Sequence, residues 1–242
     1  MSHPMDYFER IYIINLPSRT DRQAEIAAQL KAIGLSLAEG QVELFAAVRP
    51  DAAEGFPSIG AHGCFMSHLG VLRKAQQLGL QRVAIFEDDL DFAADFNARI
   101  QPLLGRLASV NWSIFYGGYH LEHALRGQAQ GELLEAQADE LIGTTHFLVF
   151  QGAAIAAAVQ YLEAILARPA GDPAGGPMHV DGAYNWFRRA NPQFKTVLAS
   201  PELGFQRASR TDIHDLRWYD RAPLVREGVA CLRLIKNTLK RR

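Results

Sequence analysis

The sequence has few cysteines, no long apolar run and almost no net charge, and each shortage excludes a class of protein. Its two cysteines, Cys64 and Cys231, cannot build a framework of several disulfides. No apolar stretch is long enough to span a bilayer, and residues 1–10 lack the apolar core of a signal peptide. A net charge of −1 gives no sign of a nucleic-acid binding surface. These shortages predict a cytoplasmic protein with reduced thiols.

Apolar sequence is abundant, at 48% of the 242 residues, and suffices for one large domain. Strands are expected at residues 11–16, 42–47, 82–86, 112–116, 144–150 and 194–199. Helices are expected at residues 20–33, 64–78, 92–107, 151–167 and 181–191, the first opened by a Thr20–Gln23 capping box. Residues 50–63 are expected to form a long loop. The alternation predicts an α/β fold with parallel βαβ units in a single domain, residues 1–222, whose last third is irregular.

The last segment, residues 223–242, differs from the rest. It carries an apolar stripe at helical spacing together with six basic residues, and is predicted to be a basic amphipathic helix. Such a helix can lie on an anionic membrane, which would place the protein at the inner face of the membrane. The alternative is a helix that packs its stripe on its own domain and leaves its charges in water.

The stretch R-V-A-I-F-E-D-D-L-D-F at residues 82–92 is an apolar run that ends in carboxylates. The run is typical of a strand buried on both faces, and ligands of open α/β sheets bind beyond the carboxyl ends of such strands. In an extended chain Glu87, Asp89 and Asp91 would share one side, with Asp88 on the other. A hard divalent cation would relieve their repulsion. The alternative is a polar strand end exposed to water.

Three stretches together resemble glycosyltransferase family 25, which includes lipopolysaccharide-type and procollagen galactosyltransferases. Residues 13–22 match its opening I-N-L…R-x-D-R, residues 63–68 its G-C-x-x-S-H, and residues 85–89 its apolar-E-D-D. Order and spacing also agree. Weaker similarities follow at Thr145-His146 and at residues 201–213, whereas Arg49-Pro50 departs from the family's usual A-V-D-G.

The resemblance implies a GT-A-like, Rossmann-type, mostly parallel sheet, a UDP-sugar donor and a Mn²⁺ or Mg²⁺ ion at the acidic cluster. Asp89 is the first candidate for direct metal ligand, and Glu87 and Asp88 would contact the metal, the ribose or a metal-bound water. His214 is a further candidate metal ligand, the alternative being a surface histidine. The other residues expected at the donor site are Asn15, Arg19, Arg22, Ser67 and His68.

Several of these residues have a purely structural alternative. Arg22 could be a solvated first-turn residue paired with Asp21 or Glu25, and His68 could be a buried histidine that bonds a backbone carbonyl. Cys64 is expected to be a small core residue. A Ser67–His68 nucleophilic pair is disfavoured, because adjacent helix residues do not face each other.

Asp181 is the candidate general base for an inverting transfer, since an acceptor hydroxyl must lose its proton as it attacks. The alternative is that Asp181 only caps the helix it opens. The sequence thus predicts a metal-dependent transferase that moves a hexose, galactose being the family's common sugar, to a glycan or lipid-linked saccharide. A metal-assisted phosphohydrolase and a non-catalytic binding module are the alternatives.

Overall fold

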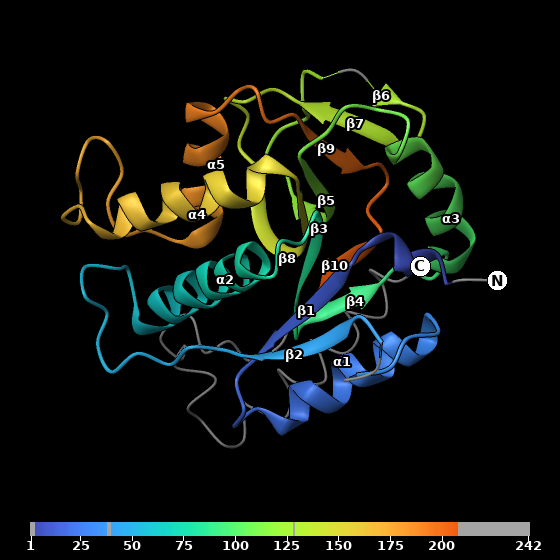
Figure 1. The fold of residues 1–242 in the computed structure, drawn as a ribbon, viewed down its shortest axis with the longest axis horizontal. Helices are drawn as coiled ribbons and strands as arrows, with labels where there is room; N and C mark the ends of the chain where they lie inside the picture. The colour runs from blue at the N-terminus through green and yellow to red at the C-terminus, as the bar shows by residue number, and fades with distance from the viewer. Residues whose placement is uncertain (1–2, 38–39, 128, 208–242) are drawn as a thin grey trace.

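The chain opens as a β–α–β–α–β unit, as its apolar pattern predicts. The computed structural model describes residues 3–37, 40–127 and 129–207. Its first elements are β1 (Arg10–Asn15), α1 (Thr20–Ala32), β2 (Val42–Ala46), α2 (Ile59–Gln77) and β3 (Arg82–Glu87). Strand β1 pairs in parallel with β2 on one side and with β3 on the other (Figure 1). The chain therefore reverses its course across the sheet at β1, and a ligand crevice is expected beyond the carboxyl ends of β1 and β3.

The remaining elements extend this unit into a wider sheet. They are a 3₁₀ helix η1 (Pro4–Tyr7), β4 (Leu90–Phe92), α3 (Phe96–Leu107), β5 (Ile114–His120), β6 (Ala129–Gln130), β7 (Leu133–Ala136), β8 (Gly143–Gln151), α4 (Ala153–Leu166), α5 (Val180–Ala190), β9 (Thr196–Ala199) and β10 (Gly204–Gln206). In the described part of the chain, the large sheet has the order β2-β1-β3-β8-β5-β9-β7-β6, and β10 pairs separately with β4. Strands β8 and β7 run against their neighbours, while the other six point the same way. The predicted α/β class is confirmed, with a sheet that is mixed.

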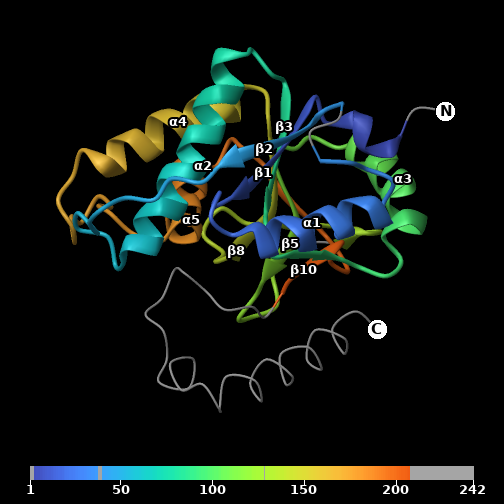
Figure 2. The same cartoon turned by 90° about the horizontal axis from the view of Figure 1, so that it is seen from below.

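Two apolar cores cover the two faces of the sheet. Alternate residues of each central strand enter opposite cores, so that Val83 and Ile85 lie in one and Ala84 and Phe86 in the other. Helices α2, α4 and α5 pack on the first face, and α1 and α3 on the second (Figure 2). The burial of β3 on both faces agrees with its apolar sequence.

Some local predictions were wrong. Helix α2 begins at Ile59, within the expected loop. Helix α1 has Arg19 at its N-cap and no side-chain capping bond, so the predicted capping box does not form. Phe92, expected to begin a helix, instead ends the short strand β4, and the helix α3 begins at Phe96.

Two predictions fall outside the described residues. The basic amphipathic helix at residues 223–242 and the candidate ligand His214 both lie there. Within the described ranges, no helix is both long and apolar enough to cross a membrane.

Candidate functional site

The acidic residues lie where β3 leaves the sheet, beside the end of β1. Glu87 ends β3, and Asp88 and Asp89 form a turn that leads into β4. Because this turn interrupts the extended chain, the predicted alternation of side chains does not hold. Asp91 instead lies in β4, buried, with its Oδ1 accepting hydrogen bonds from Nε and Nη2 of Arg207 at 2.9 and 2.7 Å. The candidate cluster therefore comprises Glu87, Asp88 and Asp89.

Asp88 ties the acidic turn to the first βα unit. One of its oxygens accepts a hydrogen bond from Nη1 of Arg22 at 2.8 Å, and the other accepts from Nδ2 of Asn15 at 2.8 Å. Both partners belong to the predicted donor-site residues, and all three side chains are largely buried. Arg22 is thus paired with Asp88 across 66 positions of sequence.

Asp89 is the carboxylate of the acidic turn that has an oxygen available to coordinate a metal ion. Its Oδ2 accepts a hydrogen bond from Nε2 of Gln206 at 3.3 Å, but its Oδ1 is buried without a hydrogen-bond partner among the described residues. Burial and the charge of Glu87 raise the pKa of Asp89 to about 7, although Arg22 at 4.0 Å opposes the shift. An orphaned carboxylate oxygen in a buried, anionic setting fits a hard divalent cation, which would supply the missing positive charge.

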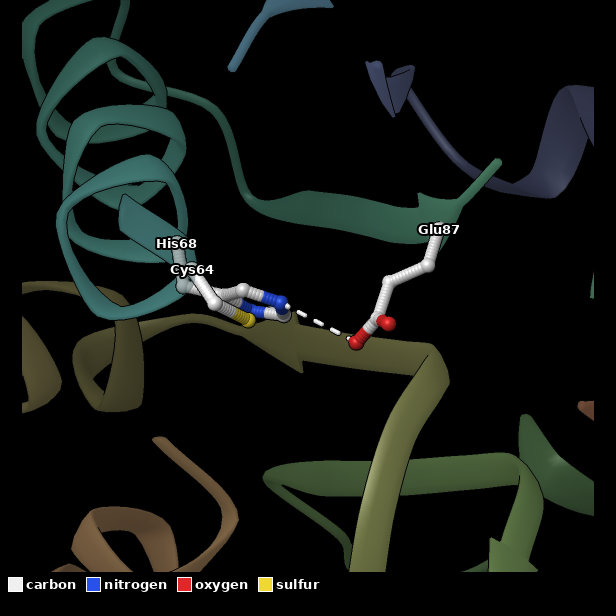
Figure 3. A group of neighbouring side chains, drawn as sticks. All are labelled: Cys64, His68 and Glu87. Carbon is white, nitrogen blue, oxygen red and sulfur yellow. Dashed lines mark ion pairs between the residues drawn. The ribbon is translucent and has the colours of Figure 1, made fainter. Parts of the chain in front are cut away.

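Glu87 is held by residues of two other elements. Its Oε1 accepts a hydrogen bond from Oγ1 of Thr145 at 2.5 Å and lies 3.4 Å from Nε2 of His68 (Figure 3). Burial raises the pKa of Glu87, but His68 and Thr145 outweigh it and leave the pKa below its ordinary value. Behind the imidazole, Nδ1 of His68 is 3.2 Å from the hydroxyl of Tyr184 in α5. His68 is therefore a buried partner of Glu87, and the bond to a backbone carbonyl that the structural alternative required is absent from its described hydrogen bonds.

The G-C-x-x-S-H stretch forms two neighbouring stripes on α2, because residues four apart share a helix face. In one stripe, Ser67 Oγ accepts a hydrogen bond from the Val48 amide at 2.8 Å and donates to the Gly63 carbonyl at 2.6 Å. In the other, Cys64 lies beside His68 and faces Glu87 (Figure 3). Ser67 thus positions the loop after β2. Cys64 is partly buried and packs against the first apolar core, so it lies at the edge of the core in which it was predicted.

Gly63 allows that loop to approach the helix. A Cβ at this position would lie 2.5 Å from the Val48 carbonyl oxygen and 3.1 Å from Pro50. Gly63→Ala is therefore expected to lower the free energy of unfolding by about 1–3 kcal/mol, as overpacking does. Gly105→Ala is the control, because Gly105 is an exposed helical glycine with no atom within 4 Å of the added Cβ. The control should gain up to about 1 kcal/mol. Urea unfolding of both variants measures the contrast, and equal stabilities would contradict this account of the glycine.

A first pocket, of about 260 Å³, opens at the carboxyl ends of β1, β2 and β3. It has apolar walls, and its cationic and acidic lining residues are Arg19, Arg22, Arg49, Glu87 and Asp88. Arg19 bonds Asp21 at 2.8 and 2.9 Å, and Arg22 bonds Asp88. The described residues give Arg49, which is exposed, no hydrogen bond or ion pair. Apolar walls with guanidinium groups are suited to a nucleotide, whose phosphates accept bidentate contacts.

A second pocket, of about 140 Å³, shares Cys64 and Glu87 with the first. Asp181 lines it from the first turn of α5, together with Thr145 and Gln206. The oxygens of Asp181 accept from the Gly182 amide at 2.8 Å and the Thr144 amide at 3.4 Å. The N-cap of α5 is His179, so Asp181 is not the capping residue that the structural alternative required.

The structure thus brings most of the predicted residues to one edge of the sheet. Four contributors were not predicted as site residues: Thr145 on Glu87, Tyr184 behind His68, Gln206 on Asp89, and Arg49 at the pocket wall. The weaker family similarities at Thr145-His146 and at residues 201–213 include Thr145 and Gln206, but they do not indicate what these side chains contact.

The fold and this edge define an α/β protein with two adjoining pockets around a buried acidic turn. The sequence comparison then gives the family that this region is similar to: residues 8–124 match the model of glycosyltransferase family 25 (LPS biosynthesis protein). All three motif stretches lie within it, and the resemblance seen in the sequence is confirmed.

Similar proteins include active and inactive members. The chain is 33% identical over 129 residues to procollagen galactosyltransferase 1-A of Xenopus laevis, covering 46% of this chain and 21% of that protein. It is 26% identical over 129 residues to the human inactive glycosyltransferase 25 family member 3, covering 46% and 22%. The chain therefore spans about a fifth of the length of these relatives. A solved glycosyltransferase involved in glycosylation of the major capsid of PBCV-1 aligns with a TM-score of 0.48 at 10% identity, covering 84% of this chain and 94% of that one.

Proposed function

We propose that this chain is a metal-dependent glycosyltransferase with a GT-A-like fold that transfers a hexose from a UDP-sugar to a saccharide acceptor with inversion. The observation that carries the proposal is the buried carboxylate oxygen of Asp89 that has no hydrogen-bond partner among the described residues. Asp89 lies in the turn between Asp88, which lines the first pocket, and β4. Its other oxygen accepts a hydrogen bond from Gln206, which lines the second pocket. The match of residues 8–124 to the model of family 25 supports the reaction class.

The first pocket is the proposed donor site. Its apolar residues would contact the uracil and ribose, and its arginines the diphosphate. Asp89 would hold Mn²⁺ or Mg²⁺, with Glu87 and Asp88 beside it, and the ion when bound supplies positive charge against the leaving nucleoside diphosphate. Each oxygen of Asp88 already accepts a hydrogen bond, one from Arg22 and one from Asn15, so its main proposed role is to orient the turn.

The second pocket is the proposed place for the sugar and the acceptor hydroxyl. Two carboxylates line it, Glu87 and Asp181. Glu87 is fixed by Thr145 and His68, whereas the oxygens of Asp181 are oriented by two backbone amides. Asp181 therefore remains the proposed base that takes the acceptor proton. Galactose is the proposed sugar, and a glycan or lipid-linked saccharide the proposed acceptor.

Calorimetric titration of UDP, with and without Mn²⁺, tests the proposal directly. Binding that strengthens with Mn²⁺, followed by release of UDP from a UDP-sugar when acceptors are screened, is the expected result. If a folded protein binds no UDP under either condition, the proposed function is wrong.

Arg49 is expected to contribute to donor affinity, because it is the pocket arginine whose charge no described carboxylate compensates. Arg49→Gln should weaken UDP binding about 10-fold, or ~1.4 kcal/mol. Arg189→Gln, which removes an exposed guanidinium of α5 that lines neither pocket, is the control and should bind UDP normally. Equal affinities in both variants would exclude Arg49 from the donor site.

The two alternatives make different predictions. A non-catalytic protein is the alternative favoured by the inactive human relative, and it would bind UDP without turnover. A metal-assisted phosphohydrolase would release phosphate from simple phosphoesters without an acceptor. Product analysis by mass spectrometry separates both from transfer.

The cytoplasmic location and the peripheral membrane contact also belong to the proposal. The basic apolar-striped segment at residues 223–242 supports the contact, which would bring the enzyme to a lipid-linked acceptor. Pelleting with anionic vesicles compares the full chain with residues 1–222, and equal binding would dismiss the contact.

A further inference from the structure

Three side chains of different chemistry meet in the wall between the two pockets. The sulfur of Cys64, a ring nitrogen of His68 and a carboxylate oxygen of Glu87 all lie within 4.8 Å of one another (Figure 3). Cys64 and His68 are one helical turn apart on α2, and Glu87 approaches from the end of β3. Sulfur, imidazole and carboxylate together are the donor set of zinc sites, whereas Mg²⁺ and Mn²⁺ prefer oxygen alone.

The spacing of these atoms is close to that of a coordination sphere. Zinc bond lengths place the donors of a tetrahedral site about 3.4–3.6 Å apart. The 3.4 Å between His68 Nε2 and Glu87 Oε1 already satisfies this. The sulfur lies within 4.8 Å of the other two donor atoms, so it must approach by no more than about 1.4 Å. Cys64 is a partly buried side chain at the edge of both pockets.

The histidine gives a second, independent observation. His68 is completely buried, and its Nε2 makes no hydrogen bond of good geometry with any described residue although it faces Glu87. Its Nδ1 lies 3.2 Å from the Tyr184 hydroxyl, the type of outer contact that orients metal-binding histidines. A buried nitrogen that faces a largely buried carboxylate needs a proton or a cation between them.

Three protein ligands also leave one position open. Cys64 and Glu87 both line the second pocket, so a fourth ligand, such as water, can enter from there. The pocket is also the entry path for an ion.

We propose that Cys64, His68 and Glu87 form a binding site for a thiophilic divalent cation of the Zn²⁺ type, separate from the oxygen-ligand site at Asp89. The site does not depend on transferase activity, because it is defined by these three side chains alone. An ion here would engage Glu87 and occupy the wall shared by the two pockets, so it should inhibit donor turnover if the proposed function is right.

Co²⁺ titration of the full chain tests the site, because a cobalt–thiolate bond gives a charge-transfer absorption that oxygen ligands do not. Wild type should bind one Co²⁺ with this absorption, and one equivalent of Zn²⁺ should abolish it, since zinc binds such sites more tightly. A folded wild type without the absorption, or one whose absorption survives excess Zn²⁺, would overturn the proposal.

Four variants locate the site, each checked for folding by thermal melting. Cys64→Ser should lose the absorption. The matched control Cys231→Ser should keep it, and so should Asp89→Asn, which changes the oxygen-ligand site. Tyr184→Phe should retain the absorption with about 10–100-fold weaker affinity, as loss of an outer contact predicts. Absorption that survives Cys64→Ser, or that disappears in Cys231→Ser or Asp89→Asn, contradicts the assignment. Since no nucleotide is present, the result is independent of whether UDP binds.

Discussion

An Asp89→Asn variant is expected to bind UDP equally weakly with and without Mn²⁺, and to transfer sugar on the order of 10³-fold more slowly than wild type. Asp89 offers the buried, unpartnered carboxylate oxygen of the acidic turn. Asparagine keeps the size and the contact with Gln206, but it removes the charge that a hard cation requires. Calorimetry with UDP and Mn²⁺, followed by an initial-rate assay, measures both effects.

The control for this variant is Asp6→Asn. Asp6 is exposed and lies in η1, before β1 and thus toward the amino end of that strand. The Asp6→Asn variant should bind UDP and respond to Mn²⁺ as wild type does. A retained Mn²⁺ response in Asp89→Asn would remove Asp89 from the metal site and leave Glu87 as the carboxylate to examine.

The same variant has an expected effect on stability in the absence of metal. Asp89 has an ordinary pKa of 3.8, which the fold raises to about 7. Between these values the unfolded chain loses its proton first, so the stability of wild type falls as pH rises from about 4 to 7. Metal-free Asp89→Asn should therefore be the more stable protein at pH 8, and this difference should shrink toward pH 4. Urea unfolding at the two pH values measures it, and added Mn²⁺ should stabilise wild type alone.

The sequence predicts those parts of the fold that depend on local patterns. The apolar runs of β1 and β3 and the helices between them follow from periodicity, and burial of both faces of β3 follows from its unbroken apolar sequence. The start of α2 could not be predicted in this way. Residues 59–63 contain two glycines and read as a loop, but Ser58 caps the helix and Gly63 is needed for contact with Val48.

The candidate site was predicted as a set of residues, but not as a set of contacts. The G-C-x-x-S-H and E-D-D stretches identified Ser67, His68 and Glu87, yet His68 and Glu87 meet only because α2 and β3 pack together. Asp91 pairs with Arg207, which lies 116 positions away, and no local sequence pattern predicts this pairing. Strands β4 and β10 were missed for the same reason, since each is three residues long and is defined by its partner.

Asp181→Asn is expected to lower kcat by about 10²–10⁴-fold while UDP affinity stays at the wild-type value, because a general base acts in the chemical step and not in donor binding. The carboxylate of Asp181 lines the second pocket and is oriented by the amides of Gly182 and Thr144. Asparagine can still accept the 2.8 Å bond from Gly182, so the helix start should be preserved. Initial rates at saturating donor and acceptor, together with UDP calorimetry, measure the two quantities.

Asp172→Asn is the matched control, since it changes a carboxylate in the loop before α5 that does not line the described pockets. Its turnover should be normal. If Asp181→Asn also turns over normally, the base must be the other carboxylate of the second pocket, Glu87. That outcome would give a new role to the contacts of Thr145 and His68, which lower the pKa of Glu87 against the effect of burial and so keep it ionised and able to accept a proton. The Asp181→Asn variant therefore decides between the two carboxylates of this pocket. A loss of turnover assigns the base to Asp181, and normal turnover assigns it to Glu87.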